Sequence, residues 1–208
     1  MTKYLLLRES PEKTEKKSKK KTLIDQPKIG MKAVICGSYR RGLESSGDID
    51  LLISGLTEED DKKFDLIDFV KYLTEEGLII DHLTEKGTTK FMGVCDKGYR
   101  IDIRFIPHES FGAALMYFTG SKTFNTLVRT EALKQGYTLE EYGLYPLITS
   151  ADKEADDGMK KKITHSHQHM KGTRILCPTE ESIFEILKID DKYLDPVNRN
   201  LDDKVVSL

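Results

Sequence analysis

The segment Gly37–Ile53, GSYRRGLESSGDIDLLI, constrains the fold of this chain more than any other stretch. The apolar run Lys32–Cys36 precedes it, and Asp48–Ile53 at its end alternates acidic and aliphatic residues, so the pattern predicts a strand, a turn and a second strand. Alternate side chains of a strand point to opposite faces. We therefore expect Asp48 and Asp50 on one face and the aliphatic residues between them in the core.

A second alternating segment, Arg100–Phe105, carries a third carboxylate, Asp102, between two isoleucines. If the strands of these aspartates are neighbours, three like charges converge, which requires protonation of one group or compensating cations. Carboxylate oxygens on rigid strands suit Mg²⁺, and two such ions about 3.5–4 Å apart can assist in-line phosphoryl transfer. A single D-x-D pattern more often marks an exposed strand face, so the carboxylates alone do not establish a metal site.

The turn before the first two aspartates has the chemistry of a phosphate site. Gly37 and Ser38 close the first strand, where backbone N–H groups and a hydroxyl can bind a phosphate. Arg40 and Arg41 follow, and a guanidinium can hold phosphate oxygens with two hydrogen bonds. Phosphate-binding groups and candidate metal ligands thus share one strand–turn–strand unit, a combination that favours phosphoryl transfer.

The remaining pattern predicts mostly strands first and helices afterwards. Acidic residues after Thr57 and apolar residues at helical spacing predict one helix at 57–77. Apolar runs between Gly-bearing turns predict strands at 78–83, 90–94 and 99–106. Helices are expected at 111–118, 124–134 and 178–187, with a polar loop at 149–172. This order indicates an α+β lobe joined to a smaller, helix-rich lobe.

Composition narrows the class of protein. Residues 1–47 carry 12 Lys/Arg and 5 Asp/Glu, whereas residues 48–110 carry 8 and 15. This distribution suits contact with polyanions beside a site that holds cations. No apolar run approaches the ~20 residues of a membrane span. The three widely spaced cysteines form no C-x-x-C pair, so we expect an intracellular protein without a disulfide scaffold or zinc ribbon.

Two polar segments allow alternative interpretations. The run Lys13–Lys21 is either a solvated tail or a source of contacts to nucleic-acid phosphates. The residues His165, His167 and His169 alternate as metal ligands can. Without a Cys or carboxylate in phase with them, a solvated loop is the favoured interpretation.

Four motifs resemble, in the same order, those of family X DNA polymerases of the beta and lambda type, in the nucleotidyltransferase superfamily. They are GSYRRGLESSGDIDLLI at 37–53, RIDIRFIP at 100–107, YFTGSKTFN at 117–125 and YGLYPL at 142–147. The resemblance implies an α+β fold: a nucleotidyltransferase palm with a mixed β-sheet and flanking helices, then a smaller α/β thumb-like lobe. It implies three parts: a basic flexible arm at 1–30, the catalytic palm at 31–108 and a nucleotide-selecting thumb-like lobe at 109–208.

The same resemblance implies roles for individual residues. The catalytic metal ligands would be Asp48, Asp50 and Asp102. The nucleotide would contact Gly37, Ser38, Arg41, Gly47, Tyr117, Phe118, Gly120 and Asn125. DNA would contact Lys90, Arg100 and Arg129. A polar cluster linked to opening and closing of the thumb would contain Arg104, Glu141 and Tyr142. This chain has Lys122 where polymerase beta has an acidic residue.

The implied function is addition of dNTPs to a primer 3′-end with two Mg²⁺ (Mn²⁺ as an alternative), in short-gap filling during base-excision or end-joining repair. Expected partners are dNTPs and gapped or primer–template DNA, with other repair proteins as further candidates. The protein would be a monomer that binds no membrane, in the nucleus of a eukaryote or the cytoplasm or virus factory of a virus. The chain has room for neither the lyase domain nor the helix-hairpin-helix subdomain of fuller members, so we expect no lyase activity and a weak hold on duplex DNA.

Two rival functions stay open. A template-independent terminal transferase is disfavoured by the Tyr117–Phe118 pair, which suggests a preference for deoxynucleotides within the resemblance, and by the lack of a long insertion after Asp102. A truncated, catalytically weak DNA-binding remnant is disfavoured because all three aspartates are present. Extension of a gapped duplex separates these alternatives.

Overall fold

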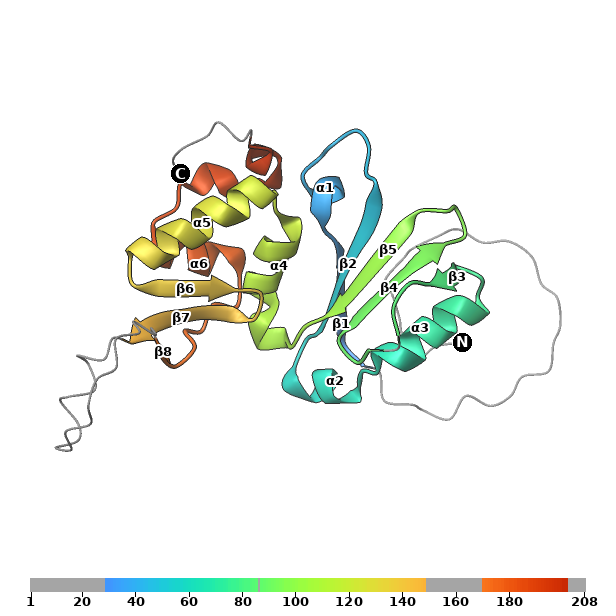
Figure 1. Ribbon diagram of the computed structural model, residues 1–208. Coiled ribbons are helices and arrows are strands. Elements are labelled where there is room, and N and C mark those ends of the chain that lie inside the picture. The colour runs from blue at the N-terminus through green and yellow to red at the C-terminus, as the bar shows by residue number, and fades with distance from the viewer. Residues whose placement is uncertain (1–28, 86, 149–169, 202–208) are drawn as a thin grey trace, which may run out of the picture.

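The computed structural model describes residues 29–85, 87–148 and 170–201, which form two sheets with helices packed against them (Figure 1). The first sheet has five strands in the order β1-β2-β5-β4-β3. Their bounds are β1 Met31–Ile35, β2 Asp48–Gly55, β3 Ile79–His82, β4 Lys90–Cys95 and β5 Arg100–Phe105. Strands β2 and β5 are parallel and the other neighbours are antiparallel, so the sheet is mixed, as predicted.

Alternation along β2 divides its side chains between two apolar clusters. Ile53 packs in the cluster that includes α3 (Leu66–Glu75), whereas Leu52 packs with α4 (Phe111–Thr119) on the other face. Helix α4 lies between the two sheets (Figure 1). Because side chains alternate, Asp50 shares the face of Leu52 and is directed toward the second half of the molecule.

The prediction of a single helix at 57–77 is wrong. The segment forms α2 (Glu58–Lys63) and then α3, separated by two extended residues. Phe64 is buried between them, and its ring stacks on that of Phe105 with 4.7 Å between the centroids. Asp65 then caps α3, with its carboxylate accepting hydrogen bonds from two backbone N–H groups of the first turn. The helical spacing of the apolar residues concealed this second start.

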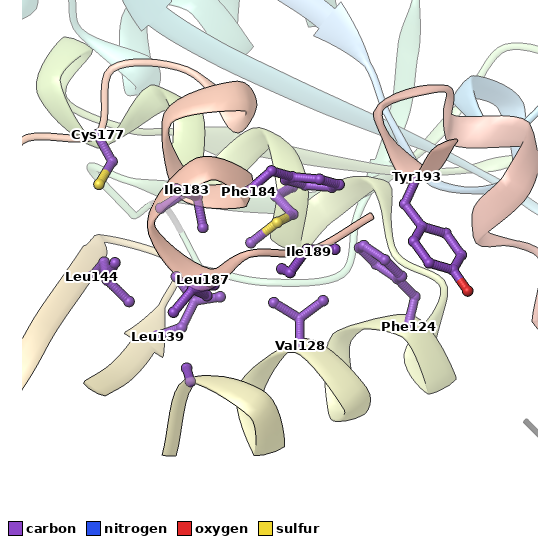
Figure 2. Packing of buried hydrophobic residues seen from close by; sticks show 13 residues of the cluster. Phe124, Val128, Leu139, Leu144, Cys177, Ile183, Phe184, Leu187, Ile189 and Tyr193 are labelled. Carbon is purple, nitrogen blue, oxygen red and sulfur yellow. The ribbon is translucent and has the colours of Figure 1, made fainter. Parts of the chain in front are cut away.

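The second half of the structure combines three longer helices with a small sheet. The helices are α4, α5 (Lys122–Lys134) and α6 (Glu180–Leu187); the strands are β6 Tyr137–Glu140, β7 Gly143–Ile148 and β8 Met170–Lys171. Phe124 and Val128 of α5 meet Phe184 and Leu187 of α6 in the core between them (Figure 2). Thr179 begins α6 through a capping box, within the helix that the sequence predicts at 178–187.

The structure also contains short elements that the sequence did not predict. One helical turn, α1 (Gly37–Arg40), occupies the predicted turn, and 3₁₀ turns lie at His108–Ser110, Asp191–Leu194 and Pro196–Arg199. Strand β8 replaces part of the loop predicted at 149–172. Residues 149–169 of that loop, with its three histidines, and the basic arm up to residue 28 lie outside the described residues. No helix among the described residues is long and apolar enough to cross a membrane.

Candidate active site

Parallel pairing of β2 and β5 brings the three predicted aspartates together. In this register Asp50 lies opposite Asp102, and Asp48 lies opposite Arg100. All three carboxylates are partly buried on the same face of the sheet. The sequence predicted this convergence only on the condition that the two strands are neighbours, and the structure meets that condition.

The convergence of the three carboxylates makes ionisation of Asp50 less favourable. Burial, and then the charges of Asp48 and Asp102, raise the pKa of Asp50 to about 6. Gly37 is packed against the same carboxylate: a Cβ built on Gly37 would lie 2.1 Å from Asp50 Oδ2. Gly37 also has a φ of +58°, which other residues rarely adopt. The turn therefore requires glycine for two independent reasons.

Arg100 compensates part of the negative charge. Its guanidinium forms an ion pair with Asp48 and lies with Nε 3.3 Å from Asp102 Oδ1. That contact lacks hydrogen-bond geometry, so the buried Asp102 Oδ1 has no hydrogen-bond partner among the described residues. No three acidic, His or Cys side chains of the described residues already form a metal-binding cluster. The donor set nevertheless fits divalent cations, since it offers hard oxygens, a carboxylate of raised pKa and an unsatisfied buried oxygen.

The polar side chains of the turn between β1 and β2 have different hydrogen-bond partners. Ser38 Oγ shares a hydrogen bond with Ser46 Oγ, which links the two ends of the turn. Arg40 is held by Thr119 and by both carboxylate oxygens of Glu180, so it is not free to bind a phosphate. Arg41 donates to the Thr119 carbonyl at 2.6 Å, and burial lowers its pKa. Gly47, also predicted at the nucleotide, lies in open space before β2.

Two neighbouring cavities contain most of the other predicted residues. The first, of about 160 Å³, is lined by Asp50, Leu51, Leu52, Lys90, Asp102, Arg104, Tyr117, Phe118 and Glu141. The second, of about 460 Å³, is lined by Arg41, Tyr117, Phe118, Gly120, Lys122, Asn125, Thr126 and Arg129. Tyr117 and Phe118 line both cavities. The predicted metal ligands and nucleotide contacts are therefore adjacent in space although they come from distant parts of the sequence.

Two residues predicted to contact ligands, Asn125 and Arg129, also contact Tyr117. Asn125 Nδ2 donates to the Tyr117 carbonyl at 2.8 Å, and the Arg129 guanidinium lies 4.9 Å from the centre of the Tyr117 ring. The Tyr117 ring in turn meets Phe118 edge to face. The sequence assigned Asn125 to a base and Arg129 to DNA but did not predict that both would hold this tyrosine.

The predicted polar cluster bridges the two halves of the structure. Arg104 of β5 pairs with Glu141, beyond β6, at 2.6 Å and lies over the Phe118 ring. Tyr142 is next to this pair, and burial followed by the Glu141 charge raises the pKa of its hydroxyl. Arg104 Nε is buried without a hydrogen-bond partner among the described residues, so the cluster is incompletely satisfied.

Sequence reasoning missed two residues that hold the site together. Asn200 Oδ1 accepts a hydrogen bond from Arg41 Nε at 2.8 Å, and its amide donates to the Arg41 carbonyl at 2.9 Å. Glu180 binds both Arg40 and the fully buried Arg199. Their sequence separations from the turn, 159 and 140 residues, leave no local signal that could have found them.

Comparison with known proteins agrees with this geometry. The family model of the DNA polymerase beta palm matches residues 8–108, and that of the DNA polymerase beta thumb matches residues 114–200. The first match contains the three aspartates and the turn between β1 and β2. The second contains the aromatic pair, α5 and the Glu141 region.

The individual proteins that the chain resembles are also DNA polymerases. DNA polymerase lambda of Rattus norvegicus is 31% identical over 183 residues, covering 82% of this chain and 29% of the relative. DNA polymerase lambda of Arabidopsis thaliana is 30% identical over 190 residues, covering 83% of this chain and 32% of the relative. The polymerase beta of Leishmania infantum, solved as a ternary gap complex, has a TM-score of 0.67 and 30% identity, covering 83% of this chain and 63% of that one. The chain thus spans less than two thirds of each relative.

Proposed function

Because the chain belongs to family X of the DNA polymerases, we propose that it adds deoxynucleotides to a primer 3′-end and releases pyrophosphate. The observation that carries this proposal is the parallel pairing of β2 and β5, which sets Asp50 opposite Asp102 beside the cavity that Tyr117 and Phe118 line. Carboxylates on adjoining rigid strands, next to cationic and aromatic groups, suit phosphoryl transfer better than simple DNA binding.

In the proposed reaction, Asp48, Asp50 and Asp102 hold two Mg²⁺, with Mn²⁺ as an alternative. When bound, these ions would stabilise negative charge on the phosphates and on the primer 3′-oxygen. Asp102 would help to accept the 3′-hydroxyl proton. The 3′-oxygen then bonds to the α-phosphorus of the dNTP, the bond from that phosphorus to the bridging oxygen breaks, and pyrophosphate leaves.

The nucleotide is proposed to lie between the turn after β1 and the end of α4. Ser38, backbone N–H groups of the turn and Arg41 would bind the triphosphate. The backbone at Tyr117 and Phe118 would lie under the sugar and base and leave little room for a 2′-hydroxyl. Asn125 donates one amide proton to the Tyr117 carbonyl, and its second proton can meet a base acceptor in the minor groove.

We propose DNA with a short gap as the substrate, with base pairing to the template selecting the nucleotide. Lys90 and Arg129 line the two cavities and are available to phosphates or bases. Arg100, which pairs with Asp48 and lies beside Asp102 in the metal-free protein, is proposed to contact DNA once its guanidinium leaves these carboxylates. Base-excision and end-joining repair are the settings that produce such gaps.

Extension of a gapped duplex by the full chain, with one dNTP supplied at a time, tests this proposal. We expect addition only of the complementary dNTP, in Mg²⁺ or Mn²⁺, and lower activity as salt rises because phosphate contacts weaken. Asp102→Ala should abolish extension, whereas Asp96→Asn, in the exposed β4–β5 turn, should retain it. Addition regardless of the template base would instead indicate a terminal transferase. Extension by Asp102→Ala would refute the metal-ligand assignment.

A further inference from the structure

The 460 Å³ cavity has an unusual charge distribution. Three cationic side chains line it, Arg41, Lys122 and Arg129, and its lining contains no Asp or Glu. The adjoining cavity has a mixed lining, with the carboxylates of Asp50, Asp102 and Glu141 beside the cations of Lys90 and Arg104. Low-dielectric walls concentrate the field of like charges in a cleft. The larger cavity is therefore suited to an anion by its protein side chains alone.

The three cations differ in how they are held. Arg41 is fixed by neutral acceptors, the Thr119 carbonyl and the Asn200 side chain. Arg129 lies over the Tyr117 ring. Lys122 is exposed, and its ammonium has no ion pair or hydrogen bond within the described part of the chain. Lys122 is therefore the cation of this cavity that can turn toward a ligand without breaking an existing contact.

We propose that Lys122 gives the cavity affinity for a nucleoside triphosphate in the absence of divalent cations. The inference rests on the proposed function, because it takes this cavity as the nucleotide site. A metal-free triphosphate carries about four negative charges, which the three aspartates repel. Lys122 offsets that repulsion from the opposite side of the aromatic pair. A nucleotide can thus enter the site before the metal ligands are neutralised.

The chemistry of lysine limits what the ligand can be. An ammonium group is a compact charge with three donors and no acceptor, so it needs phosphate or carbonyl oxygens. The affinity it provides should fall as salt rises. It should depend on the phosphates, because a nucleoside offers Lys122 no charge. These two properties separate a charge-based contact from simple stacking on Tyr117 and Phe118.

Equilibrium dialysis of the full chain against labelled dTTP, in excess EDTA without DNA, tests the inference. We expect measurable binding that weakens with salt, about tenfold weaker binding in Lys122→Glu, and binding within about twofold of the parent in Lys122→Arg. Thymidine should bind equally weakly to all variants. The matched control is Lys134→Glu, which makes the same charge change at the other end of α5, where Lys134 pairs with Glu131; it should bind dTTP as the parent does.

Three outcomes of the dialysis experiment would contradict the inference. Equal dTTP affinity in the parent and Lys122→Glu, or an equal loss in Lys134→Glu, would overturn the inference, as would no metal-free binding by the parent. Primer extension by the parent, measured in parallel, separates this failure from failure of the proposed function. Extension without a Lys122 effect refutes only the inference, whereas Lys122-dependent binding without extension refutes only polymerase activity.

Discussion

At the scale of single residues, the candidate site depends on how closely Gly37 and Asp50 are packed. Gly37 has both a positive φ and a carboxylate where its Cβ would lie. Asp50 has a pKa raised to about 6, mainly by burial and then by its two acidic neighbours. Ionisation of a carboxylate in this environment is unfavourable unless a cation lies beside it.

Gly37→Ala is expected to abolish primer extension, because its Cβ would lie 2.1 Å from Asp50 Oδ2 and displace that carboxylate. Gly77→Ala is the matched control: its φ of +73° imposes a similar backbone cost, but nothing lies within 4 Å of the added Cβ. Both variants should lose roughly 1–3 kcal/mol of stability from the positive φ. Thermal unfolding and gapped-duplex extension measure the two effects. Equal extension by the two variants would show that the packing against Asp50 is unimportant.

Asp50→Asn should stabilise the metal-free protein at pH 7.5. The folded-state pKa of Asp50, about 6, lies above its ordinary value of 3.8, so the folded protein binds more protons between these values. Stability of the parent therefore falls as pH rises through this window, by roughly 1 kcal/mol after a discount for partial exposure. Melting temperatures measured in EDTA should differ at pH 7.5 and converge near pH 4. A difference that persists at pH 4 would exclude the charge of Asp50 as its cause.

At the scale of elements, local patterns in the sequence predicted the strands of the first sheet and the helix at α6, whereas no strand was predicted at β6, β7 or β8. The sequence did not predict that β2 pairs with β5, because no local pattern specifies which strands are neighbours. The break at Phe64 was missed because it depends on a stack with the distant Phe105. Similarly, the residue types of the three aspartates indicated metal chemistry, but the pairing of Arg100 with Asp48 and Asp102 required the register of the sheet.

Asp65→Ala tests the second helix start. The Asp65 carboxylate accepts hydrogen bonds from the N–H groups of Ile67 at 2.8 Å and Asp68 at 3.3 Å. Its loss should cost about 1 kcal/mol of unfolding free energy, whereas Asp65→Ser, which retains an acceptor, should cost much less. Urea denaturation of both variants gives the comparison. If alanine and serine cost the same, the capping bonds do not stabilise α3.

At the scale of the whole molecule, the two halves are joined by buried charges as well as by α4. Glu180 at the start of α6 accepts from Arg40 of α1 at 2.7 Å and 3.0 Å, and from Arg199 at 2.6 Å. Glu180 is 5% exposed and Arg199 is fully buried. The turn between β1 and β2 is thereby fixed to α6. This arrangement makes the position of the turn sensitive to the packing of the second half.

Glu180→Gln should be the most destabilising of these substitutions, because it removes the carboxylate that pairs directly with the buried Arg199 and the partly buried Arg40. Breaking a buried ion pair from one side costs about 3–5 kcal/mol. The matched control is Glu185→Gln, at an exposed position of the same helix, which should change stability by less than about 0.5 kcal/mol.

Urea denaturation measures both variants, and Arg40→Ala shows how the cost of losing Glu180 is divided. Arg40→Ala should cost less than Glu180→Gln, since Glu180 would keep its bond to Arg199. In the double variant the two costs should sum to more than the measured total, because the first substitution already breaks the shared pair. Strict additivity, or equal stability of Glu180→Gln and Glu185→Gln, would mean that the ion pairs of Glu180 do not hold the two halves together.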